Sequence, residues 1–326
     1  MRHFSYNQGH YLKQIGFGEG MRNSACPICR TEAKRALSLR SSCEIFNCTG
    51  CGVHFAAFTK QSEPWTTTEC DHFRGLDLER YERSVRATRE SSYCNLISRV
   101  KAHVMTGNWL DVGCSYGWLL DRARKSGFHP FGVEPSPRAR MAARKKGIQV
   151  AAGNYPEVTG DGAPYSVISL MDVLEHMPGP TDVLSRTKSL LDPNGIVVLQ
   201  VPDQACLLYA IANWLHRCSL GRMDFALRRL WLVELDFPHL FYMNKRSIVY
   251  LLGKCGYEII EWYRAPIGDA QSAKDRVSYL TGESSKAISL VAVITGAINA
   301  ADALSGHGGL LTAIARPAEY FRPGSR

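Results

Sequence analysis

The sequence lacks a long uninterrupted hydrophobic run. Its most apolar stretch, residues 287–304, includes Asn299 and Asp302 and falls short of the roughly 20 apolar residues that cross a bilayer. This composition argues against a transmembrane span and predicts a buried or interfacial helix, which leaves peripheral membrane contact open. The first residues also lack the apolar core of a signal peptide, so we expect no export and a cytoplasmic location.

Acidic residues, internal repeats and low-complexity tracts are also scarce. The chain has 30 Asp and Glu residues against 39 Lys and Arg, which gives a formal charge of +9. This excess suits a phosphate-bearing substrate, a nucleic acid or a membrane surface, and equally a basic surface that only faces solvent. With 326 residues, 45% of them hydrophobic, the chain fits one large globular domain and a small appended module. Disordered and fibrous classes are thereby excluded.

Disulfides are not expected without export, so the eleven cysteines are predicted to be thiols or metal ligands. Four of them form two C-x2-C pairs at a spacing typical of zinc sites: Cys26, Cys29, Cys48 and Cys51. Two such pairs complete a closed tetrahedron around one ion. Because four thiolates leave no position for water, the predicted zinc is structural.

From residue 109 onward, apolar strand-like runs alternate with helix-like segments. The runs cover residues 109–112, 128–133, 167–170, 196–201 and 258–262. Such alternation favours βαβ units around a parallel sheet, the α/β class. A polar stretch without Gly or Pro, residues 79–105, predicts a long helix before the first of these strands.

These patterns divide the chain into three parts. We predict a zinc-ribbon module over residues 1–65, a helical linker over 66–106 and a catalytic domain over 107–326. Residues 205–235 interrupt the alternation and predict a helical insertion, interpreted either as a lid over the active site or as a helical pair packed on the sheet edge.

The segment after the first strand indicates a nucleoside site. Asp111 is followed by the loop 113–117, whose small residues Gly113, Ser115 and Gly117 let a ligand approach the backbone at a helix start. Glu134 ends the next strand, where a carboxylate can accept hydrogen bonds from both ribose hydroxyls.

A third strand then ends in Met171 and Asp172, and ligands of open α/β sheets bind at such carboxyl ends. The run of motifs 111–117, Glu134 and 172–176 resembles class I S-adenosylmethionine-dependent methyltransferases. The turn at 190–199 is similar to that family's entry into its fifth strand.

The resemblance implies a Rossmann-like seven-stranded sheet with an antiparallel last strand, for which residues 309–317 are the candidate. It places Asp111, with the loop residues Gly113, Ser115 and Gly117, at the methionine part of S-adenosylmethionine. By the same carry-over Glu134 faces the ribose, Asn154 the adenine region, and Met171 and Asp172 the edge of the donor site. Ser115 stands where many members have glycine. The loop also has one glycine fewer than the dinucleotide fingerprint, which argues against hydride transfer.

For the acceptor, a ribbon followed by a polar helix and this core resembles bacterial enzymes that methylate deoxysugars on nucleotide carriers. It also resembles uncharacterised relatives of these enzymes in glycan and natural-product gene sets. His176, in the third motif, and His239, in residues 237–242, are the catalytic candidates, with His239 as general base. The competing interpretation of His239 is a capping or packing histidine.

Two other functions stay open. The chain could be an RNA methyltransferase that uses its ribbon to bind substrate, although residues 26–55 lack the basic and aromatic stripe of base-stacking modules. It could also be a non-catalytic binding module that retains the fold.

Overall fold

Two β-sheets organise the chain. The computed structural model describes residues 23–39, 43–58, 78–233, 237–266, 286–304, 306 and 308–318. The module boundary predicted near residue 65 and the thiol of Cys70 lie outside these residues.

The larger sheet has seven strands in the order β11-β12-β9-β8-β5-β6-β7. The strands are β5 (Gly107–Val112), β6 (Phe128–Glu134), β7 (Gln149–Ala152), β8 (Tyr165–Met171), β9 (Leu191–Pro202), β11 (Tyr257–Ala265) and β12 (Leu310–Pro317). The pairs from β9 through β8, β5 and β6 to β7 are parallel, whereas β12 runs antiparallel to both β9 and β11. The predicted α/β, Rossmann-like sheet with an antiparallel last strand is therefore confirmed.

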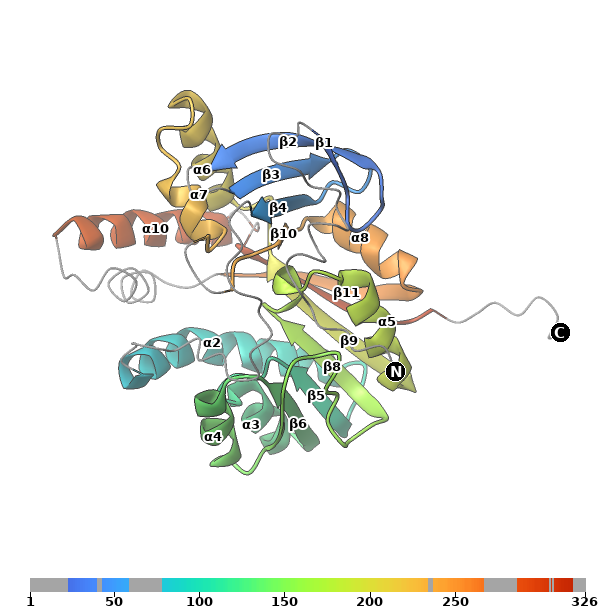
Figure 1. Cartoon of the computed structure of the whole chain (residues 1–326). Coiled ribbons are helices and arrows are strands. Elements are labelled where there is room, and N and C mark those ends of the chain that lie inside the picture. The colour runs from blue at the N-terminus through green and yellow to red at the C-terminus, as the bar shows by residue number, and fades with distance from the viewer. Residues whose placement is uncertain are drawn as a thin grey trace.

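Helices connect these strands (Figure 1). They are α2 (Leu78–Lys101), α3 (Trp118–Lys125), α4 (Pro137–Arg144), the short 3-10 helix η1 (Leu174–His176), α5 (Pro180–Leu190), α6 (Leu207–Cys218), α7 (Phe225–Leu230), α8 (Lys245–Lys254) and α10 (Lys286–Leu304). The long helix predicted before the first strand corresponds to α2. Among the described residues, every helix is too short or too polar to cross a membrane.

Burial explains how the first βα unit holds its shape. Leu119, Leu120 and Ala123 form the buried side of α3 and pack with Trp109 of β5 and Phe128 of β6. The rings of Trp109 and Phe128 meet edge to face, with their centroids 5.0 Å apart. Because these large side chains pack the helix tightly against the strands, both ends of the loop between β5 and α3 are held in place.

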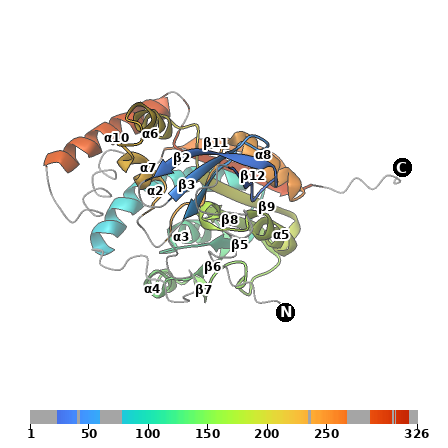
Figure 2. The same cartoon turned by 45° about the horizontal axis from the view of Figure 1, so that its top comes forward.

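The smaller sheet contains the cysteine module. Its order is β1-β2-β3-β4-β10, with β1 (Asn23–Ala25), β2 (Glu32–Leu39), β3 (Cys43–Cys48), β4 (His54–Phe58) and β10 (Phe241–Tyr242). The last strand, β10, lies between α7 and α8 in the sequence and pairs antiparallel with β4, Phe241 opposite Phe55. Figure 1 shows this sheet above the larger one, beyond one of its edges, and Figure 2 shows the same arrangement with the top turned forward. The two sheets also share one hydrophobic core.

The smaller sheet lies beyond the carboxyl ends of β8 and β9. The backbone N–H of Leu240 donates to the carbonyl of Glu175, just after β8, at 2.7 Å. Asp203, just after β9, forms a β-bridge with Met243. The module thus stands at the sheet edge where ligands of α/β folds bind.

The insertion is helical, as predicted, and comprises α6 and α7. Its helix α6 packs against the smaller sheet: Tyr209 hydrogen-bonds His54 at 2.9 Å, and His216 approaches the Ser38 carbonyl at 3.2 Å. Trp231 is fully buried, whereas Trp214 is 63% exposed. The insertion therefore packs against the cysteine module, and its helix α6 also contacts α10 through the N–H of Leu207, which donates to Asp302 at 3.0 Å.

Candidate active site

The loop between β5 and α3 is built from left-handed residues. Gly113, Ser115 and Gly117 have φ values of 67°, 48° and 71°. A Cβ on Gly113 would lie 2.8 Å from Val173, and one on Gly117 would lie 2.7 Å from Ile148, so no larger residue fits either position. Ser115 adopts the same left-handed backbone with a side chain, at a conformational cost. Glycine is therefore common at this position for a geometric reason.

Two buried carboxylates flank this loop. Ser169 donates to Asp111 at 2.5 Å, and the backbone N–H groups of Ser115 and Ser136 each donate to a different oxygen of Glu134 at 2.8 Å. Burial raises the pKa of Asp111 to about 7, although the Ser169 hydrogen bond opposes it. Burial also raises the pKa of Glu134, against the two N–H donors.

The orientation of Glu134 is thus fixed before any ligand binds. Each of its oxygens accepts one backbone N–H and keeps a second lone pair. Those lone pairs are available to two neighbouring hydroxyls of a ribose.

Asp172 lies at the carboxyl end of β8. It follows Met171, the half-buried last residue of β8, and has a left-handed φ of 56°. Its carboxylate accepts from Gln200 at 3.3 Å and pairs with Arg89 of α2 at 2.5 Å. Sequence reasoning missed Arg89, because α2 is polar throughout and its spacing does not single out one arginine.

Asn154 lies in the loop after β7. Its backbone carbonyl accepts from Val158 at 3.0 Å, which shapes the turn. The side chain is half-buried. The loop thus stands at the carboxyl end of β7, next to the strand that ends in Glu134.

The structure brings His176 and His239 together. Their ring centroids are 4.7 Å apart, and Nδ1 of His176 lies 3.1 Å from the carbonyl of Pro238. Burial lowers the pKa of both histidines, and for His239 the neighbouring His176 lowers it further. Both rings are therefore neutral at neutral pH.

Glu175 lies in the same cluster. It is fully buried, and among the described residues neither of its side-chain oxygens has a hydrogen-bond partner. Burial, and then the charge of Asp172, raise its pKa. Beside His239, whose ring meets that of Tyr242 edge to face, the stacked rings of Tyr242 and Tyr209 and the tilted ring of Trp231 form an aromatic wall.

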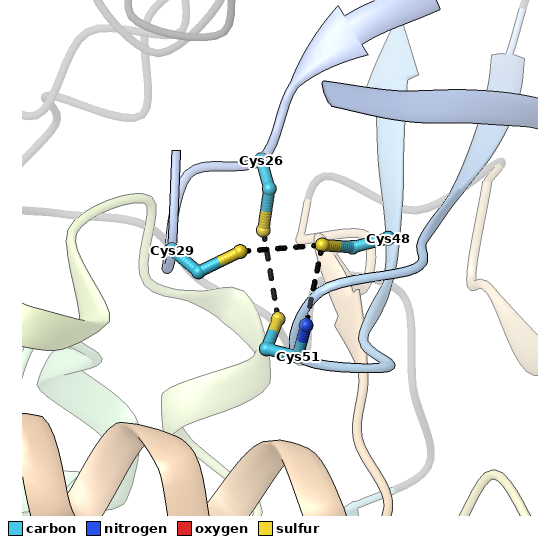
Figure 3. A group of neighbouring side chains, drawn as sticks. All are labelled: Cys26, Cys29, Cys48 and Cys51. Atoms are coloured by element: carbon cyan, nitrogen blue, oxygen red, sulfur yellow. Dashed lines mark hydrogen bonds between the residues drawn. The ribbon is translucent and has the colours of Figure 1, made fainter. Parts of the chain in front are cut away.

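The four predicted cysteine ligands converge on one point (Figure 3). The Sγ atoms of Cys26 and Cys51 are 3.7 Å apart, those of Cys29 and Cys48 are 3.3 Å apart, and all four lie within 4.8 Å of one another. A tetrahedral zinc with Zn–S bonds of about 2.3 Å needs sulfurs about 3.8 Å apart. The cluster has nearly that size.

The two cysteine pairs lie on two turns of the same geometry. The N–H of Arg30 donates to the carbonyl of Cys26, and the N–H of Gly52 donates to the carbonyl of Cys48, both at 2.9 Å. Arg30 and Gly52, each directly after a second cysteine, are left-handed with φ of 65° and 82°. The repeated turn aims both thiols of each pair at the same centre, so these residues fit a zinc ion.

A family model described as "Methyltransferase domain" matches residues 85–261. The chain belongs to this methyltransferase family. The matched region contains the loop after β5, Glu134 and the cluster around His176. The predicted class I S-adenosylmethionine-dependent methyltransferase is confirmed, and a hydride-transfer enzyme is excluded.

Curated relatives cover part of the chain. The ubiquinone biosynthesis O-methyltransferase of Pasteurella multocida is 27% identical over 128 residues, which are 34% of this chain and 53% of that protein. The protein of the same name from Aeromonas salmonicida is 33% identical over 99 residues, 28% of this chain and 41% of its own length. The chain thus spans about half the length of the curated relatives it matches.

Solved structures agree on the fold. A chain from the complex of the Haloferax volcanii Trm112 methyltransferase activator with a methyltransferase superposes with a TM-score of 0.52 at 13% identity, over 77% of this chain and 99% of that one. At this identity the similarity shows the fold alone.

Proposed function

We propose that this methyltransferase transfers the methyl group of S-adenosylmethionine to a small-molecule, nucleotide-sugar or glycan acceptor. The observation that carries the proposal is the meeting of His176 and His239 beyond the carboxyl end of β8, beside Asp172 and beneath the cysteine module. In this place an acceptor would lie between the donor loop and the aromatic wall. The similar Pasteurella multocida and Aeromonas salmonicida proteins are named O-methyltransferases, which supports a hydroxyl acceptor.

The donor would occupy the edge formed by β5, β6 and β8. In this proposal Asp111, Gly113, Ser115 and Gly117 contact the methionine part, Glu134 accepts from the ribose hydroxyls, and Asn154 lies near the adenine, with Met171 and Asp172 beside the methyl group. The buried, preoriented carboxylate of Glu134 supports the ribose assignment. Arg89 adds a positive charge near Asp172, which suits the carboxylate of the donor.

Methyl transfer is an in-line displacement. The acceptor oxygen forms a bond to the methyl carbon while the carbon–sulfur bond breaks, and the electron pair of that bond stays on sulfur. The acceptor proton must leave, and His239 can take it because its ring is neutral and its buried Nδ1 has no hydrogen-bond partner among the described residues. The ring of His176 lies beside that of His239, with its Nδ1 3.1 Å from the Pro238 carbonyl.

The cysteine module would carry a structural zinc and enclose the acceptor. With four thiolates around the ion, no coordination position is left for chemistry. The module's contribution is the pairing of β4 with β10, which places the segment containing His239 over the site.

A binding and turnover experiment tests the proposal. Calorimetry with S-adenosylhomocysteine should show one site per chain, and thermal-shift screening of nucleotide sugars in its presence should reveal the acceptor class. His239→Gln should lower turnover by about 10² to 10⁴ and leave S-adenosylhomocysteine affinity unchanged. The exposed His129 supplies the matched control, His129→Gln, which should have no effect.

Other outcomes point to the other functions. Absence of S-adenosylhomocysteine binding would favour a non-catalytic module. Tight RNA binding that weakens steeply with salt would instead favour an RNA methyltransferase, which the formal charge of +9 would suit.

A further inference from the structure

A second group of metal-ligating side chains lies apart from the four cysteines. Glu175 and His176 come from η1, and His239 comes from the segment before β10. Candidate ligand atoms of these three residues all lie within 4.8 Å of one another. The adjacent residues Glu175 and His176 and the distant His239 thus present two imidazoles and one carboxylate to a common point.

The carboxylate of Glu175 lacks the partners that a buried acid normally has. It is fully buried, and within the described part of the chain neither oxygen makes a hydrogen bond. The nearby cation Arg89 pairs with Asp172 and acts on Glu175 only as a neighbouring positive charge, which lowers the pKa of Glu175 against the effect of burial. Burying a carboxylate without a partner costs several kcal/mol, so such groups are usually paired or coordinate a metal. Both side-chain oxygens of Glu175 are therefore available to coordinate a cation.

Each of the two histidines has a ring nitrogen whose lone pair is available to a metal ion. Nδ1 of His176 lies 3.1 Å from the Pro238 carbonyl, which can only accept, so Nδ1 carries the proton and Nε2 keeps a free lone pair. Metal-binding histidines are commonly oriented by such a bond on the other ring nitrogen. In His239 the buried Nδ1 has no partner among the described residues, while the backbone N–H is fixed by the carbonyl of Trp231 at 3.0 Å.

We propose that Glu175, His176 and His239 bind one divalent transition-metal ion, of the type that prefers two imidazoles and a carboxylate. This donor set leaves open positions that could hold the acceptor oxygen, as in other sites with two histidines and one carboxylate. The inference rests on the proposed function for the position of the acceptor. The site goes beyond that function. With Nδ1 of His239 bound to the ion, the ion would replace His239 in activating the acceptor, because a bound hydroxyl has a lowered pKa and loses its proton more readily.

Cobalt titration of the full, zinc-loaded chain tests the site. One Co²⁺ per chain should bind in addition to the zinc, without the thiolate-to-cobalt charge-transfer absorption that binding to the cysteines would give. Glu175→Gln and His239→Gln should each weaken this binding at least about tenfold. His129→Gln, at an exposed histidine, should leave it unchanged.

S-adenosylhomocysteine calorimetry on the same samples separates the two proposals. If no second Co²⁺ binds to the wild type, or if Glu175→Gln binds it equally well, the metal site is wrong, while intact S-adenosylhomocysteine binding leaves methyl transfer standing. Glutamine matches glutamate in volume, and His176→Gln provides a second test if Glu175→Gln loses S-adenosylhomocysteine binding through misfolding. Loss of S-adenosylhomocysteine binding in the wild type contradicts the proposed function instead.

Discussion

Glu134 shows how one side chain can be positioned for a ligand by the backbone alone. Two N–H groups, from Ser115 and Ser136, hold its two oxygens. A carboxylate accepts from both donors at once, whereas an amide has only one accepting oxygen. The charge of Glu134 is therefore needed both for the loop geometry and for the proposed ribose contact.

Glu134→Gln should weaken S-adenosylhomocysteine binding by roughly 10- to 100-fold, because one backbone N–H then faces an amide NH₂ and a charged hydrogen bond of about 1.5 to 3 kcal/mol is lost. Isothermal calorimetry measures the change. Glu258→Gln, an exposed substitution on β11, serves as the control. Equal affinity in Glu134→Gln and the wild type would remove Glu134 from the donor site.

The sequence predicted these residues unevenly. Asp111 and Glu134 could be found because each directly follows or ends an apolar strand, so that local pattern alone places them at the sheet edge. Arg89 could not, since its partner Asp172 is distant in sequence and its neighbours on α2 are equally polar. Glu175 lies within the motif 172–176, but its lack of hydrogen-bond partners among the described residues is a property of the folded core.

At the scale of elements, the contact between α6 and the smaller sheet depends on His54. Its Nδ1 lies 2.9 Å from the Tyr209 hydroxyl. Burial, with a smaller contribution from Arg217, lowers the pKa of His54 to about 4, from an ordinary value of 6.5. As the pH falls below 6.5, the unfolded chain therefore takes up this proton before the folded chain does, and the folded state loses stability.

His54→Gln should remove this pH dependence, since glutamine does not titrate. From pH 7 to pH 5, the unfolding free energy of the wild type should fall by about 1 to 2 kcal/mol more than that of the variant. Denaturant titrations at both pH values provide the measurement. A difference between the two proteins that is the same at pH 5 and pH 7 would contradict the assignment.

The periodicity of apolar residues in the sequence predicts the long helices and strands better than the short strands. The long apolar strands and α2 follow from patterns that only one secondary structure explains. β7, with the sequence QVAA, and β10, with two residues, are too short to show an alternation. They are strands because of the neighbours with which they pair, and those neighbours lie far away in the sequence.

At the scale of the whole molecule, the proposed zinc would stabilise not only the two cysteine turns but also the segments of the larger domain that contact them. Asn244 donates to the carbonyl of Gly52 at 2.9 Å, and Lys254 contacts the carbonyl of Ile28 at 2.5 Å, so both cysteine turns are tied to the start and end of α8. The N–H of Ala56 also donates to the carbonyl of Leu240 at 2.9 Å. The ion would thus help to hold the segment that carries His239.

Removal of zinc by a chelator should expose the amides of Ala56 and Leu240 to hydrogen exchange, because structural zinc supplies folding free energy to small modules. The amides of Gly113 and Cys114, which are bonded to Val133, should stay protected and serve as the internal control. Mass spectrometry or NMR measures the exchange, and added zinc should restore protection. Unchanged exchange at Leu240 would show that the ion does not support this segment.

The added strand β10 also constrains the order of assembly during synthesis. The contact between Gly52 and Asn244 spans 192 positions, so a nascent chain exposes the cysteine module long before the strand that completes its sheet. Until then β4 is an open edge with unpaired backbone groups, the kind of edge that pairs with other chains. A chain that stops before residue 241 should consequently aggregate more readily than the full-length protein.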